Sequence, residues 1–301
     1  MRIIGKKGFR FITFAVILLF GILIIPNKVG AASYQRVYDK SKIAGKYFWN
    51  DDGKIMVSET KNSDGECIQK NVNNSFITNG EIIYFIKGYQ RDDINVYRIN
   101  ADGTKKKHIK KLKHAGNLSG FYGNKVYYER HTSYHNECDE TWIHEYSYDI
   151  ETRKIKKVAD SCCFRDSYKQ YFIGEPNAGD YAPCPLILYN AKSGKKNIIT
   201  DSNLGFYLQE NKIYFADALK EGEQYKYDNE NSTWEVSIKS YHIKTERIKI
   251  IAKKLKIHSI DEINSKKVIY SISYKDGESQ YYSYNYKTGK KKKTINLSHF
   301  L

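Results

Sequence analysis

The sequence has few helix- and strand-breaking prolines and no motif of a familiar enzyme class. It contains four prolines and two methionines among 301 residues. It has no P-loop and no dinucleotide-binding fingerprint, and the segment 116–120, GNLSG, is not a nucleophile elbow. No Ser-His-Asp or Cys-His signature stands out. We therefore predict no catalytic residue and no cofactor from the sequence.

An odd cysteine count and the absence of helical patterning narrow the fold class further. Five cysteines exclude complete pairing into intramolecular disulfides. No segment of useful length repeats its apolar residues at the helical spacing. The chain contains 27 tyrosines, and aromatic residues favour strands. The composition indicates a β-rich globular chain.

Residues 1–31 have the pattern of a secretory signal peptide. Four basic residues precede an uncharged apolar run from Phe11 to Ile25, and small residues at 29–31 suit a cleavage site. The run is short for a membrane span, which needs about 20 residues. We expect a secreted or extracellular protein associated with the cell envelope, without a membrane span after cleavage. The alternative is an N-terminal membrane anchor formed by an uncleaved signal.

The chain carries a formal net charge of +16, and removal of the five basic residues in 1–31 leaves +11. In an exported protein this charge favours anionic cell-wall polymers, acidic glycans or membrane surfaces as neighbours. Nucleic acid is not an expected partner.

Residues 266–297 show the unit from which the rest of the chain is built. Apolar and polar residues alternate from Val268 to Tyr274 and again from Tyr282 to Tyr286, which predicts two strands. Asp276-Gly277 supplies a turn between them, and Thr288-Gly289 leads to a third short strand. We expect this last unit to pair near the strand that begins around Tyr34.

The same unit recurs along the chain, with room for a fourth strand in each copy. The aromatic strand cores lie 36 to 55 positions apart, at 47–49, 83–85, 126–128, 171–173, 213–215 and 268–270. We predict an all-β fold, a monomeric six-bladed β-propeller of four-stranded antiparallel blades over residues 34–301. Its blades are expected at 34–73, 74–115, 116–160, 161–201, 202–257 and 258–301. The alternative is a β-sandwich or a solenoid of hairpins.

The succession of strand, hairpin, strand and a Tyr-x-x-x-Thr-Gly-Lys-like turn resembles the TolB-like and dipeptidyl-peptidase-type β-propeller superfamily. It also resembles secreted propeller proteins of Gram-positive bacteria. The resemblance covers residues 34–301 and implies an architecture, because such folds host many unrelated functions. Propellers of this superfamily often precede a hydrolase domain, and none is expected after the last unit.

Units three to five have the long loops between their second and third strands, at 131–140, 175–185 and 218–233. Long loops on a rigid scaffold commonly carry binding residues. We expect the functional face there, and the alternative is that these loops have drifted neutrally. Candidate binding residues are the loop side chains Tyr134, Asp180, Tyr181, Tyr225 and Trp234.

Four cysteines are expected on this same face. Cys138 and Cys184 fall in long loops, and Cys162 and Cys163 begin the fourth unit. One or two disulfides are plausible in an exported protein: Cys184 with Cys162 or Cys163, and Cys138 with the other. Cys67, just past a tight turn, is expected to keep a partly buried free thiol.

One loop combines residue types that bind metals. His131, His135 and Cys138 match no established zinc spacing. We interpret the segment as a polar loop with one disulfide cysteine, and a zinc or copper site is the alternative. The acidic residues Asp217, Glu221, Glu223, Asp228 and Glu230 lack the order of a calcium loop, and we interpret them as a solvated hairpin.

Lysine runs follow nearly every tight turn, at 105–107, 110–113, 195–196 and 290–293. These positions belong to the expected outermost strand of each blade, where lysine protects an exposed edge. Contact with a polyanion is the second interpretation, and the two are compatible.

The sequence thus favours a secreted binding or scaffold protein that recognises a protein or glycan ligand on the face with the long loops of blades three to five. A propeller-type lyase or hydrolase with a loop-borne metal or His/carboxylate site is one alternative. A protein that binds an anionic cell-wall polymer is the other.

Overall fold

The computed structural model describes residues 34–37, 39–73, 75–88, 93–132, 142–176, 183–229, 232–273 and 279–294. The expected signal peptide at 1–31 lies outside these ranges. The described residues form strands and turns without a helix, so no helical segment among them could span a membrane.

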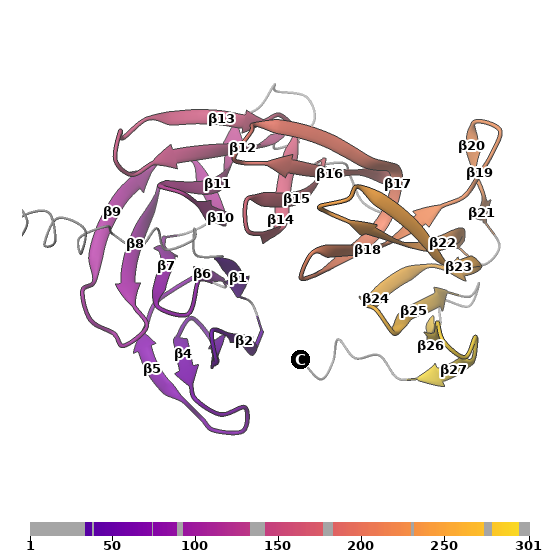
Figure 1. The fold of residues 1–301 in the computed structure, drawn as a ribbon, viewed down its shortest axis with the longest axis horizontal. Helices are drawn as coiled ribbons and strands as arrows, with labels where there is room; N and C mark the ends of the chain where they lie inside the picture. The colour runs from indigo at the N-terminus through magenta and orange to yellow at the C-terminus, as the bar shows by residue number, and fades with distance from the viewer. Residues whose placement is uncertain are drawn as a thin grey trace, which may run out of the picture. The chain divides into compact units, whose positions relative to one another are not determined.

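Consecutive strands pair antiparallel in the first half of the chain (Figure 1). One four-stranded sheet contains Ser41–Ile43 (β2), Lys46–Asn50 (β3), Ile55–Ser58 (β4) and Glu66–Gln69 (β5). A five-stranded sheet contains Gln35–Val37 (β1), Phe76–Thr78 (β6), Ile82–Lys87 (β7), Ile94–Asn100 (β8) and Lys107–Leu112 (β9). The next four-stranded sheet contains Ala115–Tyr122 (β10), Lys125–Thr132 (β11), Trp142–Asp149 (β12) and Ile155–Ala159 (β13).

The second half repeats this order with one long shared strand. Cys162–Tyr168 (β14), Tyr171–Pro176 (β15) and Cys184–Asn190 (β16) pair in sequence and lead to Lys195–Gln209 (β17). The far part of β17 pairs with Lys212–Ala218 (β18). β18 pairs in turn with Thr233–His242 (β22), and β22 pairs with Arg247–Ile257 (β23). The short strands Lys220–Glu221 (β19), Gln224–Tyr225 (β20) and Tyr227–Asp228 (β21) extend the β18–β22 connection. The last sheet contains Ser259–Ile263 (β24), Lys267–Ser273 (β25), Ser279–Asn285 (β26) and Lys291–Thr294 (β27).

Side chains become less buried from the second to the fourth strand of each four-stranded unit, where β6 counts as the first strand of the second unit. In β7 and β18 nearly every side chain is buried, because neighbouring sheets cover both faces of these strands. In the fourth strands β9, β13 and β27 most side chains are exposed or half-buried. The lysine runs at 107–111 and 291–293 lie on these edge strands, which confirms their expected position.

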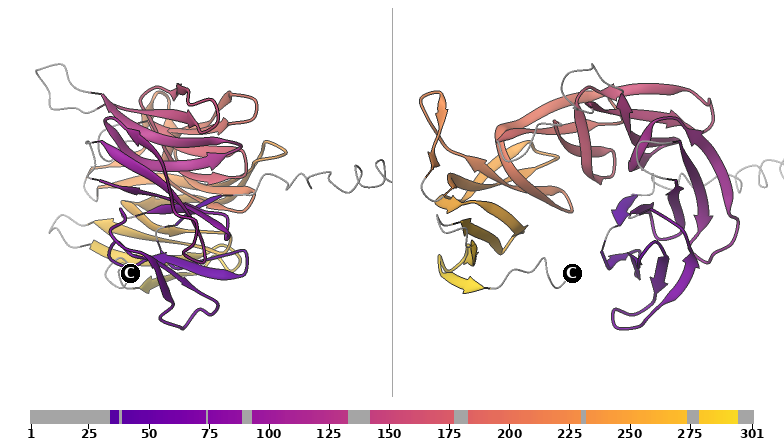
Figure 2. Two further views of the ribbon diagram at one scale, coloured as in Figure 1. Left: turned by 90° about the vertical axis from the view of Figure 1, so that its left-hand side faces the viewer. Right: turned by 180° about the vertical axis from the view of Figure 1, so that it is seen from behind.

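Successive sheets pack face to face (Figure 2), with aromatic and aliphatic side chains between them. The Tyr127 ring on β11 lies 4.4 Å from the Phe172 ring on β15, measured between centroids. Phe172 is fully buried, and a Cβ atom added at Gly120 on β10 would lie only 2.2 Å from its ring. Glycine at 120 is therefore what allows the third and fourth sheets to approach this closely.

The first strand pairs differently from the sequence-based prediction. Gln35–Val37 pair with Phe76–Thr78 of β6, not with the last hairpin. Val37 is fully buried in a core cluster with Phe76 and Phe85, and this burial favours the observed pairing. The prediction of pairing with the last unit was wrong because alternation of residues does not specify a partner strand.

Candidate functional site

Three second strands carry a carboxylate near the end from which a long loop leaves. Glu129 lies near the end of β11, Glu175 near the end of β15 and Asp217 near the end of β18. We call these three residues the carboxylate row. The connections that follow them are the long loops predicted for units three to five.

Contacts between neighbouring strands bring the ends of these strands together. Asn203 on β17 donates from Nδ2 to Oε1 of Glu175 over 2.5 Å, and Asn203 is the register partner of Asp217. Glu175 is in turn the register partner of Cys163, whose thiol is electrostatically coupled to Glu129. The ends of β11, β15 and β18 therefore lie near one another.

Glu129 and a second glutamate form a buried pair where β11 pairs with β12. Glu129 is 3% exposed and Glu145 is fully buried, and they are register partners on β11 and β12. Ser119 donates to Glu145 over 2.9 Å, and the Phe164 backbone N–H donates to its Oε1 over 2.6 Å. The burial of Glu145, reinforced by the adjacent Glu129 carboxylate, raises the pKa of Glu145 to about 8.

Glu129 keeps unused hydrogen-bonding capacity. Its Oε2 accepts from Nδ2 of Asn117 over 3.2 Å, whereas the buried Oε1 has no hydrogen-bond partner among the described residues. His131 lies two residues further along the same strand, and both side chains occupy the space above Gly116. A Cβ atom at Gly116 would lie 2.6 Å from Nε2 of His131 and 3.2 Å from Oε2 of Glu129.

The other two members of the carboxylate row are held by polar partners. Burial raises the pKa of Glu175, while Arg165 and the Asn203 amide act in the opposite direction. Asp217 is 6% exposed and accepts from Ser202 over 2.8 Å, from Thr200 and from the Lys239 ammonium. The interpretation of Asp217 as part of a solvated hairpin was wrong, because β18 extends to Ala218 and carries this carboxylate into the protein interior.

The predicted metal-binding loop is only partly covered by the structure. His131 lies on β11, whereas His135 and Cys138 lie outside the described residues. Within the ranges that the structure describes, no group of three or more His, Cys, Asp and Glu side chains is arranged to hold a metal ion.

The described cysteines gather largely where the sequence placed them. Cys162 and Cys163 begin β14 and Cys184 begins β16, near the carboxylate row. All three carry free thiols, so the disulfide expected between Cys184 and Cys162 or Cys163 is not shown, and Cys138 lies outside the described residues. Burial raises the pKa of Cys162 and of Cys163 to about 12. Cys67 on β5 is a partly buried free thiol, as predicted.

Two of the predicted binding residues meet in an aromatic cluster. Tyr225 and Trp234 contact edge to face, with ring centroids 6.1 Å apart and planes at 88°. The Tyr227 ring also packs against Trp234, with ring centroids 4.3 Å apart, and Tyr227 is 40% exposed. We call Tyr225, Tyr227 and Trp234 the aromatic cluster. The remaining candidates, Tyr134, Asp180 and Tyr181, lie outside the described residues.

The sequence analysis missed the carboxylate row and the glutamate pair. One signal was available, because in units three, four and five an acidic residue follows the apolar core of the second strand within two positions. The facing of Glu129 and Glu145 had no such signal, since it depends on the register across the loop between β11 and β12.

Comparisons with known proteins address the fold. No protein-family model matches the chain, and no curated protein matches its sequence. Among solved structures, an oligogalacturonate lyase from Vibrio parahaemolyticus is similar with a TM-score of 0.55 at 10% identity, over 89% of this chain and 80% of the lyase. An oligogalacturonate lyase in complex with manganese is similar with a TM-score of 0.52 at 9% identity, over 87% of this chain and 78% of the lyase.

A peptidase structure is similar over part of its length. The acylaminoacyl peptidase of Pyrococcus horikoshii has a TM-score of 0.51 at 12% identity, over 87% of this chain and 46% of the peptidase. Identities this low establish the fold and leave the activity open. The chain therefore shares the β-propeller fold of these structures, which the sequence had predicted.

Proposed function

We propose that this chain is a secreted, six-bladed β-propeller that binds a glycan on the face carrying the long loops of units three to five, at the aromatic cluster of unit five. Six successive groups of four antiparallel strands support the blade number: β2–β5, β6–β9, β10–β13, β14–β17, β17 with β18, β22 and β23, and β24–β27. The signal-like segment at 1–31 supports secretion.

The aromatic cluster is the observation that carries the glycan proposal. Tyr225 and Tyr227 lie on the two-residue strands β20 and β21, Trp234 lies at the start of β22, and packing between the rings fixes their orientation. A partly exposed aromatic ring offers a flat apolar face on which the C–H face of a sugar ring can stack, with a polar edge in water. Because the rings are already in place, binding would order few side chains, which favours affinity.

Polar groups next to the cluster suit the hydroxyl and amide groups of a sugar. The Lys220 ammonium lies 4.7 Å from the Tyr225 ring centroid and 3.0 Å from the Asp201 carboxylate. The Tyr225 hydroxyl donates to the backbone carbonyl of Asp201 over 3.2 Å. A few fixed polar groups around an apolar surface are typical of sites that bind small polar ligands.

Binding of chitohexaose, a soluble oligomer of N-acetylglucosamine, tests this proposal by titration calorimetry. Tyr227→Ala should weaken binding by at least about tenfold, equal to about 1.4 kcal/mol. The matched control is Tyr207→Ala, since Tyr207 is a similarly exposed tyrosine on β17 at 47%. The control should bind as the native protein does. Equal losses in both variants, or no binding by the native protein, would remove the proposal.

A lyase or hydrolase is the second candidate function. The observation in its favour is the Glu129–Glu145 pair with His131 beside it, because the pKa of Glu145 is raised to about 8, within the range of a general acid. Both carboxyl groups are enclosed, at 3% and 0% exposure, so they do not face a solute in this structure. This enclosure is the reason for preferring the binding proposal.

Incubation with oligogalacturonate and a divalent metal separates the two candidates. The binding proposal predicts no rise in ultraviolet absorbance from unsaturated product. Product formation that Glu129→Gln abolishes, and that Glu151→Gln in an exposed turn leaves intact, would establish the enzyme instead.

A further inference from the structure

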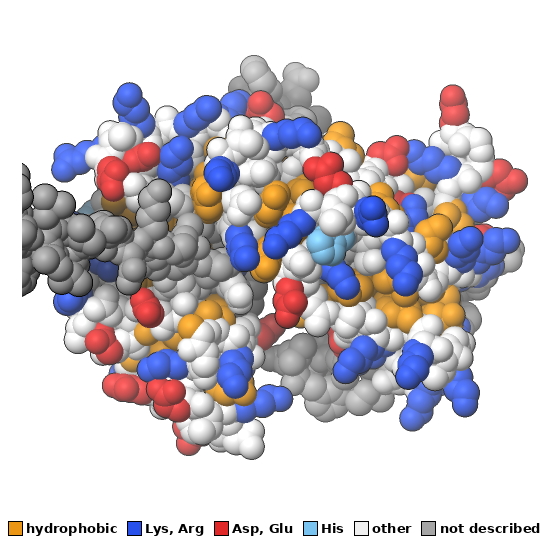
Figure 3. All heavy atoms as spheres, viewed as in Figure 1, with side chains coloured by type: hydrophobic (Ala, Val, Ile, Leu, Met, Phe, Trp, Pro, Cys, Tyr) orange, Lys and Arg blue, Asp and Glu red, His pale blue; other side chains and the backbone are white. Residues whose placement is uncertain are grey.

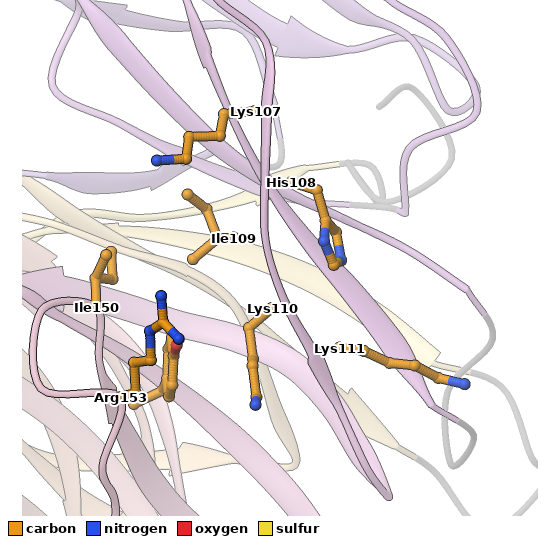
Figure 4. Close-up of a pocket in the computed structure, with 8 residues that line it drawn as sticks. Lys107, His108, Ile109, Lys110, Lys111, Ile150 and Arg153 are labelled. Carbon is orange, nitrogen blue, oxygen red and sulfur yellow. The ribbon is translucent and has the colours of Figure 1, made fainter.

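A hollow with a positive lining separates the outer edges of the second and third units. It has a volume of about 470 Å³, and Figure 4 shows most of the side chains around it. One wall is the edge strand β9, and the other is the end of β12 with the turn that follows it. Its lining residues are Lys107, His108, Ile109, Lys110, Lys111, Tyr148, Ile150 and Arg153. We call this hollow the basic groove.

A β-bulge sets which lysines face the groove. Tyr97 pairs with His108 and Val96 with Lys110, so Ile109 is an extra residue between these two pairs. In a regular strand, residues 107 and 110 would point to opposite faces of the sheet. The bulge brings Lys107 and Lys110 to the same face and turns His108 and Lys111 to the other, as Figure 4 shows.

Arg153, in the turn after β12 of the facing unit, adds a third cation to Lys107 and Lys110. It has a left-handed backbone, with φ of 60°, and its N–H donates to the Asp149 carbonyl over 2.8 Å. None of the described residues that line the groove is acidic. Lys111 pairs with Asp93 over 3.0 Å, whereas Lys107, Lys110 and Arg153 form no ion pair with any residue that the structure describes.

Edge protection explains part of this arrangement. Lysines on β9 protect an exposed strand edge, and the same holds for Lys291, Lys292 and Lys293 on β27. Protection of an edge does not require an arginine on the neighbouring unit, nor a bulge that turns two lysines toward it. Figure 3 shows lysine and arginine scattered widely over the visible face, so a positive charge alone does not distinguish a site.

The floor of the groove indicates the class of anion. Ile109 and Ile150 are half-buried aliphatic side chains, and Tyr148 is 3% exposed with the Lys110 ammonium 5.8 Å from its ring centroid. The Tyr148 ring is therefore covered, and the exposed His108 ring lies on the other side of β9 from Lys107 and Arg153 (Figure 4). Single-stranded nucleic acids are bound largely by stacking of bases on exposed rings, which this side of the groove does not offer. Three cations in an open groove instead match the repeated charges of a polymer backbone.

We propose that the basic groove binds a linear polyphosphate chain through adjacent phosphate groups, with Lys107, Lys110 and Arg153 as its contacts. Lysine contributes a compact point charge and arginine a planar fork that can bind two phosphate oxygens at once. This site is distinct from the aromatic cluster and stands independently of the glycan proposal.

Fluorescence anisotropy with labelled inorganic polyphosphate over a series of salt concentrations tests the proposal. Native protein is compared with the triple variant Lys107→Gln, Lys110→Gln, Arg153→Gln. A second triple variant, Lys291→Gln, Lys292→Gln, Lys293→Gln, removes the same charge from another edge strand. The groove variant should bind polyphosphate at least about tenfold more weakly. The slope of log K against log salt should become less steep by about three, one for each cation removed. The β27 variant should lose less than about threefold.

Equal losses in the two triple variants would show that net charge alone binds the polymer, and an unchanged groove variant would show that the groove is not the site. Either result overturns the proposal. Polygalacturonate and oligo-dT serve as further probes: groove-dependent binding of either that is tighter than that of polyphosphate also overturns it. If the groove triple variant does not fold, the single variant Arg153→Gln is measured instead, with Lys293→Gln as its control.

Discussion

Glu129 and Glu145 face each other across β11 and β12, and both side chains are buried. Two carboxylates in this position repel each other if both are charged, and like charges directly opposite in a sheet are destabilising. The arrangement is tolerated because burial and this repulsion raise the pKa of Glu145 to about 8, so that it is protonated at neutral pH.

A dependence of stability on pH follows from this raised pKa. The carboxyl group of Glu145 has a pKa near 4.5 when unfolded and about 8 when folded. The stability associated with its neutral form is therefore complete below about pH 4.5 and lost as pH rises toward 8. Glu145→Gln stays neutral at every pH, so it should gain stability relative to the native protein between pH 5 and pH 8, by up to roughly 4 kcal/mol.

Urea unfolding at several pH values measures this difference. Glu151→Gln, in an exposed turn, is the control and should follow the native profile. Glu129→Gln should flatten the profile in part, because it removes the like charge that helps to raise the pKa of Glu145. Parallel profiles for the native protein and Glu145→Gln would show that Glu145 is not buried as described.

Gly120 and Phe172 lie close together between the third and fourth units, so the effects of mutations at these two positions on stability should not be additive. Gly120→Ala places a methyl group within 2.2 Å of the Phe172 ring, so it should cost about 1–3 kcal/mol of stability. Phe172→Leu removes the ring atoms concerned. The double variant should therefore be less destabilised than the sum of the single variants, by at least about 0.5 kcal/mol.

Phe48→Leu provides the control for this cycle, since Phe48 is fully buried in a different core cluster. Its combination with Gly120→Ala should be additive. Additivity for Gly120 with Phe172 as well would mean that the two sheets do not pack as the structure has them.

The buried thiols predict a clear order of cysteine reactivity. Cys162 and Cys163 are at most 1% exposed, and burial raises the pKa of each to about 12. Because the thiolate is the reacting form, both should resist alkylation in the native protein at pH 8. Cys67, which is partly exposed, should react first.

Brief labelling with iodoacetamide followed by peptide mass spectrometry gives the order directly. The experiment uses a Cys138→Ser background, because Cys138 lies outside the described residues. Full labelling of Cys162 and Cys163 should appear only in denaturant. Labelling of these two as fast as Cys67 would contradict their burial.

The sequence predicted the fold because a meander repeats a local pattern. Alternation in segments such as 268–274, with turn residues between them, identifies strands without knowledge of their partners. The sequence also predicted the position of the lysine runs, since the strand after each tight turn is an edge strand. The same reasoning located the ends of the long loops and brought Tyr225 and Trp234 into one candidate set.

What the sequence did not predict depends on pairing between strands. The facing of Glu129 and Glu145 follows from the register across a long loop, and the facing of Lys107 and Lys110 follows from a bulge at Ile109. Asp217 was misjudged because the end of β18 within a polar segment has no local marker. In each case a shift of one residue would reverse which side chains are buried.

Emission from Trp234 tests the central proposal most directly. The chain has three tryptophans, so Trp49→Phe and Trp142→Phe leave Trp234 as the single reporter. Titration of this variant with chitohexaose should change the emission in a saturable way, with the same Kd that calorimetry gives, and Tyr227→Ala should weaken that response. Binding by calorimetry without a change in Trp234 emission, or no binding at all, would contradict a glycan site at the aromatic cluster.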